Sequence, residues 1–572
     1  MKNKKNLIIF VIALIVVSVL KQLLVYNLPI VANVALGVDD MLMIDITNNL
    51  VNGNWVGPYS DIIISKGLTF PLLLAFCYFI KIDYITMMTL LYTLACLIFI
   101  YVLSKKIKNK LLLFIIYTVT LFVPTMYSYQ VMQRVYRNSI IPSFAIMIIA
   151  GYLYLFFTRN EEYYKKKILA SIGTGFIFSL FWYTREDSIW MLPFIIFISI
   201  SIIVAKIAKN KKINKELLKT LVILVIPIVM TFTYKNILCY HNYKHFGVYT
   251  VYNNEQYDKA MKSLKKVKKY DYYDNIDFTM EKLKRVSEVT CLGNIYGRLV
   301  DLVFGYSLFD SGPLDGEVVN GWFPWAFKAT LSECGYYGSP QDLNNFCYTL
   351  HIQIEENLAN GTLEREDVKP DIISAIKKVC YETGQVFKTL YTYDDIGFEG
   401  EKFEYEAKYE NSYQTYAKYT NNKFLLYDTE TNEDKYYFDN MENYAESIKS
   451  RTEIINKLIN IYKIISNVVF ISGVVLYLIF SVIVIKQVFK KKFENLEMWV
   501  TISGILGAML TLVLGIAYET AFNAYVITAM YLSAVYPLML LFGTIMMGHT
   551  ITKILEKIKF IKRKKLPLEN DV

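Results

Sequence analysis

The sequence predicts a polytopic α-helical membrane protein with one inserted soluble domain, and three observations lead to that prediction. The 572 residues are 54% hydrophobic and only 20% charged, with a mean hydropathy of +0.31, which is too apolar for an ordinary soluble multidomain protein. Apolar runs near the ~20 residues that a bilayer requires recur along the chain. Between residues 239 and 458 such runs are absent, and Tyr, Asp, Glu, Asn and Lys dominate.

The first apolar run extends from Leu7 to about Tyr26 and follows the basic start MKNKKN. It is longer than the apolar region of a typical secretory signal, and no A-x-A-like cleavage site follows it. We therefore expect an uncleaved first span with a cytoplasmic N-terminus.

About ten spans are predicted along the chain. They lie at residues 7–26, 84–104, 111–127, 138–157, 168–184, 188–207, 218–238, 460–485, 498–517 and 526–550. One further apolar run, GLTFPLLLAFCYFI at Gly67–Ile80, is ambiguous. Counting it as a span would place the lysines of residues 105–110 outside and invert every later loop, so we expect an interfacial helix there.

The basic residues set the expected topology. With about ten spans, all the basic blocks fall on one side, which the positive-inside rule assigns to the cytoplasm. These blocks are Lys105–Lys110, Lys165–Lys167, Lys206–Lys219, Lys486–Lys492 and the tail Lys553–Lys565. Both termini are then cytoplasmic in the plasma membrane, and the net charge of +10 reflects membrane topology rather than a nucleic-acid partner.

Three domains follow from this layout. Residues 1–238 form a transmembrane module whose first exterior loop is 27–83, residues 239–458 form an exterior domain, and residues 459–572 hold the last spans and a basic cytoplasmic tail. Early exterior segments such as DFTMEKLKRVSEVTCL have helical spacing, whereas EGEKFEYEAKYENS and KFLLYDTETNEDKYYFD alternate like strands. The exterior domain is therefore expected to be mixed α/β or mainly α.

Four of the seven cysteines fall in the exterior domain, at Cys291, Cys334, Cys347 and Cys380. An exterior compartment permits disulfides, and four cysteines allow three pairings, but unpaired thiols remain the simpler alternative. The sequence has no C-x-x-C spacing, which argues against a zinc site.

Ionisable residues beside membrane spans are costly and often functional. On the expected exterior side they form four groups. These are Asp39 and Asp40 in GVDDMLMID, Lys66 in SKG, Arg134 and Arg137 in QRVYRNS, and Arg185 in WYTREDSIW. Each group has an ordinary alternative, namely a solvated acidic loop, a snorkelling lysine or arginines that contact lipid headgroups.

Carboxylates beside several arginines at a membrane surface favour a substrate that is both anionic and lipidic, such as a polyprenyl-phosphate sugar. Arginine forks match phosphate oxygens, and they stabilise a departing phosphate. A carboxylate can then take the proton from an attacking hydroxyl, or it can hold a cation that organises the donor. A divalent cation is therefore left open.

The order of these segments resembles the GT-C superfamily of polyprenyl-phosphate-sugar glycosyltransferases. The similar features are a first span, an exterior loop opening with GVDDMLMIDITNN, an interfacial SKGLTFPLLLAF and a later exterior turn in FWYTREDSIWMLPF. The closest branch is the type of protein O-mannosyltransferases and lipid A aminoarabinose transferases. The chain departs from it at Ser65, Lys66 and Gly67, where many members have His-Pro-Pro.

The resemblance implies transfer of a sugar from a polyprenyl-phosphate donor, with inversion, to a protein, lipid or glycan acceptor. It makes Asp39 the candidate base, with Asp40 orienting the acceptor or sharing a cation. Arg134, Arg137, Arg185 and Lys66 would bind the donor phosphate. The alternatives are a non-catalytic lipid-glycan carrier, a cell-envelope assembly factor, and a glycan polymerase or ligase. A carrier would place ionisable residues deep inside its spans.

Overall fold

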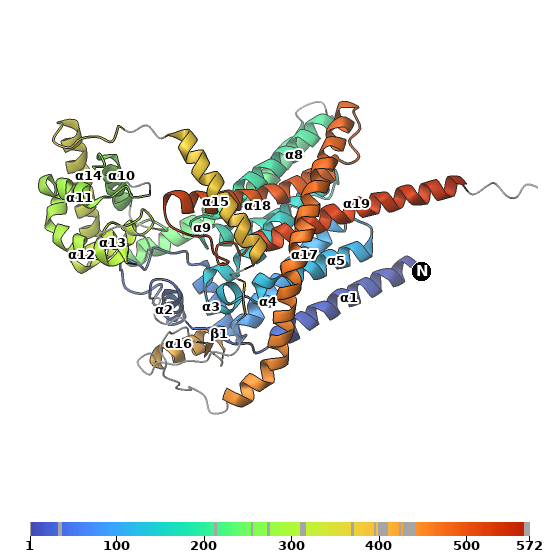
Figure 1. Cartoon of the computed structure of the whole chain (residues 1–572), viewed down its shortest axis with the longest axis horizontal. Coiled ribbons are helices and arrows are strands. Elements are labelled where there is room, and N and C mark those ends of the chain that lie inside the picture. The colour runs from blue at the N-terminus through green and yellow to red at the C-terminus, as the bar shows by residue number, and fades with distance from the viewer. Residues whose placement is uncertain are drawn as a thin grey trace, which may run out of the picture.

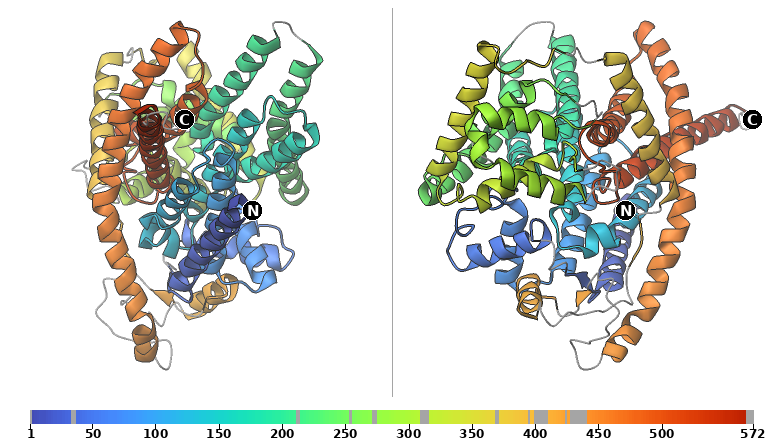
Figure 2. Two further views of the ribbon diagram at one scale, coloured as in Figure 1. Left: turned by 90° about the vertical axis from the view of Figure 1, so that its right-hand side faces the viewer. Right: turned by 60° about the vertical axis from the view of Figure 1, so that its left-hand side comes forward.

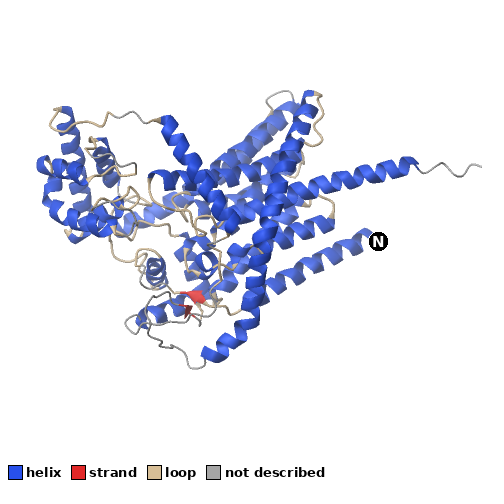
Figure 3. Cartoon of the chain, viewed as in Figure 1, coloured by secondary structure: helices blue, strands red, loops and turns tan. Residues whose placement is uncertain are grey.

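The structure is a computed structural model, and it is helical through nearly all of its ordered elements (Figures 1 and 3). The residues that it describes are 2–32, 37–210, 214–252, 255–270, 275–308, 316–367, 371–393, 396–398, 410–422, 425–426 and 441–565. The predicted polytopic helical architecture is confirmed at this level.

Among the described residues, eight helices are long and apolar enough to cross a membrane. They are α1 (Lys2–Val25), α4 (Tyr84–Leu103), α6 (Ile141–Phe157), α8 (Leu192–Asn210), α9 (Lys215–Phe246), α17 (Met441–Phe489), α18 (Leu496–Phe522) and α19 (Val535–Lys565). Each overlaps one of the ten predicted spans. The chain is therefore a multi-pass membrane protein.

Two of the predicted spans are not among these eight helices. The run at 111–127 forms α5 (Lys110–Leu121), which ends before the short helix η1 (Pro124–Met126) because proline restricts the residue before it to extended geometry. The run at 168–184 lies in α7 (Tyr164–Trp182), whose first turn carries Lys165–Lys167. The ambiguous run forms α3 (Thr69–Ile80), whose 12 residues are too few to cross a bilayer.

Small residues let the apolar helices approach closely. A Cβ atom at Gly175 of α7 would lie 2.8 Å from the Cα atom of Pro227 in α9. A Cβ atom at Gly473 of α17 would lie 2.8 Å from the Cα atom of Gly543 in α19. In lipid there is no hydrophobic driving force between helices, so close packing of this kind is what holds the spans together.

The residues predicted to be exterior divide into a separate helical unit and two helices that pack against the bundle. The unit has its own apolar core, and Figures 1 and 2 show it at one end of the molecule. It consists of α10 (Glu255–Lys266), α11 (Met280–Val289), η5 (Cys291–Asn294), α12 (Tyr296–Ser307), α13 (Phe323–Glu333) and α14 (Pro340–Ala359). We call residues 255–367 the exterior unit, after the side of the membrane that the sequence predicts for them.

Helices α15 (Ile372–Thr392) and α16 (Glu410–Thr420) do not belong to this unit. Helix α15 packs on α18, and α16 packs on α3 and on α2 (Asp40–Val51). The predicted domain boundaries at residues 239 and 458 both fall inside helices, in α9 and α17. The described residues of the predicted domain 239–458 therefore pack in more than one place, the exterior unit around its own core and α15 and α16 against other helices.

Strands are nearly absent from the described residues. The only pairing of named strands joins β1 (Ile30–Val31) in parallel to β2 (Leu425–Leu426). Most of the two segments predicted to alternate, 399–412 and 423–439, lies outside the described residues. Of the two alternatives for the exterior domain, the described part fits a mainly α module.

All seven cysteines are free thiols in the structure. Within the exterior unit, Cys347 is buried, Cys291 is partly buried and Cys334 is exposed. None of the three pairings that four cysteines allow is formed, so the unpaired alternative describes this structure.

Candidate functional site

The structure brings the six predicted site residues together from four separate segments. Asp39 and Asp40 lie at the start of α2, and Lys66 precedes α3. Arg134 follows the π-helix η2 (Tyr129–Gln133), and Arg137 begins the short helix η3 (Arg137–Ser139). Arg185 lies in the turn between α7 and η4 (Ser188–Met191) and completes the set.

Asp39 is the partly exposed member of the acidic pair, with 29% of its side chain accessible. Its carboxylate forms an ion pair with Lys66 and accepts a hydrogen bond of 2.9 Å from the Tyr136 hydroxyl. The second oxygen lies 3.7 Å from Nη2 of Arg134. Asp39 is therefore oriented by three side chains and still open to solvent on one side.

Asp40 is fully buried and forms an ion pair with Arg134. Nε of Arg134 donates to Oδ1 of Asp40 at 2.8 Å and to Oδ2 at 3.0 Å, and Nη2 also contacts Oδ2. Burial raises the pKa of Asp40, and the Arg134 hydrogen bonds oppose that rise. An Arg–carboxylate fork of this kind fixes both partners, so Asp40 holds Arg134 in place.

Lys66 lies inside the cluster rather than at a lipid-facing surface, with only 6% of its side chain exposed. Its ammonium donates to the Tyr136 hydroxyl at 2.9 Å. Burial, and next the positive charge of Arg137, lower the pKa of Lys66 to about 6, while Glu186 opposes the shift. Asp39 therefore faces a cation that releases its proton more readily than an exposed lysine does.

The other two arginines have carboxylate partners that reach solvent. Nη1 of Arg137 donates to both oxygens of Glu186, at 2.8 and 2.9 Å, and Glu186 is 45% exposed. Burial works to raise the pKa of Glu186, but Arg137 outweighs it and the pKa is lowered. Nε of Arg185 donates to Asp187 at 2.9 Å, and Asp187 is 44% exposed.

Residues that were not predicted from the sequence complete the site. The Tyr136 hydroxyl accepts a hydrogen bond from Nε of Arg137 at 3.2 Å, as well as from Lys66. Nη1 of Arg185 donates to the side-chain oxygen of Asn138 at 2.8 Å. Both residues lie within QRVYRNS, Tyr136 between the two arginines and Asn138 directly after the second, and this nearness to the arginines was the available signal.

The loop between α18 and α19 closes one side of the site. Nη1 of Arg134 lies 3.2 Å from the sulfur atom of Met530, and the guanidinium of Arg185 lies 4.8 Å from the centre of the Tyr531 ring. The same loop binds the exterior unit, because the backbone N–H of Gly321 donates to the carbonyl of Asn523 at 3.2 Å. The loop therefore joins the site arginines to the exterior unit.

The exterior unit also reaches the site directly through α13. The Lys66 ammonium lies 5.4 Å from the centre of the Trp325 ring, and the Lys328 ammonium lies 5.1 Å from the same ring. At these distances the Trp325 ring forms cation–π contacts with both ammonium groups. Trp325 lies in NGWFPWAFKATLSECGYYGSP, a segment whose aromatic residues the sequence alone could not separate from core residues.

The described residues hold no group of three or more His, Cys, Asp or Glu side chains arranged to bind a metal ion. Both carboxylates of the acidic pair face cations, Asp39 facing Lys66 and Asp40 facing Arg134. This arrangement fits proton transfer and anion binding better than coordination of a divalent cation.

Comparisons of the chain with models of protein families, with curated proteins and with solved structures found no match.

Proposed function

We propose that the chain transfers a sugar from a polyprenyl-phosphate donor to an acceptor hydroxyl, with Asp39 as the base. The observation that supports this most is the contrast within the acidic pair. Asp40 is buried against Arg134, whereas Asp39 is partly exposed among buried cations beside apolar helices. A carboxylate of this kind can meet an acceptor while the neighbouring cations meet a phosphate.

In the proposed reaction, Asp39 takes the proton of the acceptor hydroxyl. The acceptor oxygen forms a bond to the anomeric carbon as the bond from that carbon to the phosphate oxygen breaks, which inverts the anomeric centre. The bonding electrons leave with the polyprenyl phosphate. Tyr136 orients Asp39 through its 2.9 Å hydrogen bond, and Lys66 contacts the same carboxylate from a second side.

Arg137 and Arg185 are the better candidates to bind the donor phosphate. Their partners, Glu186 and Asp187, are close to half exposed, so a phosphate can replace these carboxylates without unpairing a buried acid. Arg134 is held by the fully buried Asp40. Its proposed role is to add positive charge near Asp39 and the leaving phosphate.

The proposed orientation places the site at the exterior face and both termini in the cytoplasm. The N-terminal end of α1 and the C-terminal end of α19 lie on the side opposite the exterior unit in Figure 1. The basic blocks at Lys105–Lys110 and Lys486–Lys492 fit a cytoplasmic side under the positive-inside rule. The resemblance to GT-C enzymes agrees with this orientation.

A donor survey tests the proposal. Membranes that contain the chain would be incubated with radiolabelled polyprenyl-phosphate sugars, and label would be followed into acceptor and into water-soluble products. The proposal predicts transfer from at least one monophosphate-linked donor, with release of polyprenyl phosphate in equal amount. Flipping of the donor across the bilayer without transfer would contradict it and would favour the lipid-glycan carrier.

A further inference from the structure

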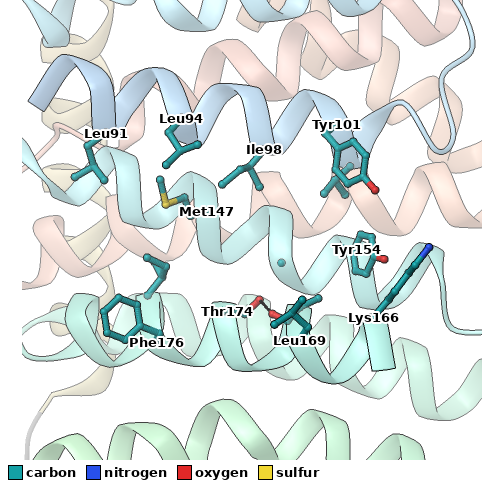
Figure 4. Close-up of a pocket in the computed structure, with 15 residues that line it drawn as sticks. Leu91, Leu94, Ile98, Tyr101, Met147, Tyr154, Lys166, Leu169, Thr174 and Phe176 are labelled. Atoms are coloured by element: carbon teal, nitrogen blue, oxygen red, sulfur yellow. Dashed lines mark hydrogen bonds between the residues drawn. The ribbon is translucent and has the colours of Figure 1, made fainter. Parts of the chain in front are cut away.

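A groove on the membrane-spanning part of the molecule lies apart from the site described above. Helix α6 packs on both α4 and α7, and residues of all three helices line a space of about 640 Å³. That volume falls within the usual range for small-molecule sites. We call this space the α4–α7 groove, and Figure 4 shows the side chains that line it.

Two glycines shape the groove. A Cβ atom at Gly151 of α6 would lie 2.0 Å from the side-chain oxygen of Thr174, so Gly151 lets α6 and α7 pack closely. A Cβ atom at Gly173 of α7 would meet no atom within 4 Å, because this exposed glycine borders the open space. A large side chain at residue 173 would therefore project into that space.

The polar groups of the groove gather at one end. Figure 4 shows Tyr101, Tyr154 and Lys166 together at one end, with Leu91 and Phe176 toward the other. The hydroxyl of Thr174, near the middle, is already bonded to the carbonyl oxygen of Ala170 at 2.7 Å. The groove therefore offers an apolar channel that ends in hydroxyl and ammonium groups.

The charge at the polar end is positive. The Lys105 ammonium lies 5.6 Å from the centre of the Tyr101 ring and 5.0 Å from that of Tyr154, which places a second lysine at the same end of the groove as Lys166. None of the fifteen described residues that line the groove is acidic. Glu161 and Glu162 lie in the chain between α6 and α7, outside the lining.

We propose that the α4–α7 groove binds an anionic phospholipid. Its acyl chains would lie between α4 and α7, and its phosphate would meet Lys105, Lys166 and the two tyrosine hydroxyls. Basic pockets between spans are a recurring way to hold anionic lipid headgroups on the cytoplasmic side. The same end of the groove lies beside Lys105–Lys110 and Lys165–Lys167, the blocks assigned to that side.

Lys105 and Lys166 lie far from the candidate site along α4, so the proposed phospholipid and the proposed sugar donor would occupy different sites. Helix α4 begins at Tyr84, whose hydroxyl bonds the carbonyl of Arg134 in the candidate site at 2.8 Å. The polar end of the groove lies at Tyr101 and Val102, near the other end of that 20-residue helix. A donor phosphate at the candidate site is therefore on the opposite side of the bilayer from the groove lysines.

The test measures lipid retained by the purified full-length chain in detergent. Dioleoylphosphatidylglycerol and dioleoylphosphatidylcholine would be added at equal mole fraction, and bound lipid would be counted by native mass spectrometry. We expect selective retention of phosphatidylglycerol by the wild type. Lys105→Gln and Lys166→Gln should each weaken that retention about fivefold and leave phosphatidylcholine unchanged.

Gly173→Trp should remove the retained lipid by filling the groove. Gly515→Trp is its matched control, because Gly515 is also an exposed glycine with open space around its Cβ position and lies on α18, away from the groove. If Gly173→Trp fails to elute as a single folded species, the two lysine variants decide the question without altering helix packing.

Three results would overturn the proposal. Equal retention of both lipids would show that the groove does not recognise an anionic headgroup. Retention by Gly173→Trp that equals retention by Gly515→Trp would place the lipid elsewhere. Displacement of phosphatidylglycerol by an equimolar polyprenyl phosphate would assign the groove to an isoprenoid chain instead.

Discussion

At the scale of single residues, the site is a set of cations that each have a carboxylate partner. Lys66 pairs with Asp39, Arg134 with Asp40, Arg137 with Glu186 and Arg185 with Asp187. The pairs differ in how easily another anion can displace the carboxylate from its cation, since only Asp40 is fully buried. In the proposed mechanism, this difference gives Asp40 the role of holding Arg134 and leaves Asp39 as the base.

Tyr136 provides the first residue-level prediction. Its hydroxyl donates to Asp39 and accepts from Lys66 and Arg137, so Tyr136→Phe removes three hydrogen bonds while keeping the ring. Because a hydrogen bond to a charged group contributes roughly 1.5–3 kcal/mol, we expect kcat for sugar transfer to fall about tenfold or more. The donor KM should change little.

The control for this variant is Tyr84→Phe. The Tyr84 hydroxyl donates to the backbone carbonyl of Arg134 at 2.8 Å rather than to the carboxylate of Asp39. A similar loss of kcat in both variants would mean that Tyr136 supports the fold rather than the orientation of Asp39.

The clustering of the charged residues could be predicted from the sequence, but their pairing could not. The positive-inside rule places Asp39, Arg134 and Arg185 on one side of the membrane from the lysine blocks alone. It cannot show that Arg134 pairs with Asp40, because these residues are 94 positions apart in the chain. It also gives no reason to select Tyr136 from 47 tyrosines.

At the scale of helices and loops, the candidate site depends on the segment between α2 and α3. Gly67 lies directly against the turn after α7, since a Cβ atom there would be 2.0 Å from the carbonyl oxygen of Tyr183. This close approach positions Lys66 beside Asp39. Glycine is the residue that permits two backbones to lie so close.

Gly67→Ala should therefore destabilise the protein and disturb the site together. The added methyl group meets backbone atoms that cannot rotate away, and overpacking of this kind costs roughly 1–3 kcal/mol. We expect a lower Tm of the purified chain and weaker transfer. Gly507→Ala, at a position with nothing within 4 Å of its Cβ, should leave both unchanged. Equal Tm values for the two variants would contradict the close packing.

The exterior unit contains a buried lysine, Lys282, whose titration should make the stability of the folded chain depend on pH. Lys282 is fully buried, and its ammonium donates to the carbonyl of Asp277 at 2.9 Å. Burial lowers the pKa of Lys282 from 10.5 to about 7. Between about pH 7 and 10.5 the unfolded chain binds a proton at Lys282 that the folded chain does not, so stability should rise with pH over that window.

Lys282→Met should remove this contribution and flatten the profile. The measurement is the urea concentration at which the exterior unit becomes sensitive to a protease, followed from pH 7 to 10 in the full-length chain. Lys284→Met, which alters an exposed lysine of the same helix, is the control. A wild-type profile as flat as that of Lys282→Met would refute the assignment.

Helix positions could be predicted better than helix partners. The apolar spacing identifies all eight long spans, but it cannot show that α15 leaves the exterior unit. Val386 and Leu390 of α15 are buried in the core of the transmembrane bundle. Composition alone groups α15 with the polar exterior segments, because α15 has no apolar run long enough to cross a membrane. Tertiary packing decides the domain division.

At the scale of the whole molecule, the exterior unit lies at one end, and the N-terminal end of α1 and the C-terminal end of α19 point toward the other (Figure 1). The unit contacts the candidate site through Trp325 and the loop between α18 and α19. The proposed acceptor would therefore meet a surface built from both the unit and the membrane-spanning part. Hydropathy predicts the two parts separately but carries no information on this contact.

The proposed topology can be tested with thiol reagents that do not cross membranes. Cys334 and Cys380 are exposed thiols among the residues proposed to be exterior. They should be labelled in intact cells. A cysteine introduced as Lys490→Cys, in a variant with the native exposed cysteines replaced by serine, should be labelled only after permeabilisation. The opposite pattern would invert the topology and remove the exterior site.

The most direct test of the central claim compares sugar transfer by Asp39→Asn and Asp45→Asn at matched expression. Asp45 is an exposed carboxylate on the same helix, so its variant controls for loss of charge. Asparagine keeps the shape of Asp39 but cannot accept the acceptor proton. The account predicts that transfer falls at least about a hundredfold in Asp39→Asn and stays near wild type in Asp45→Asn. Transfer by Asp39→Asn at the wild-type rate would contradict the account.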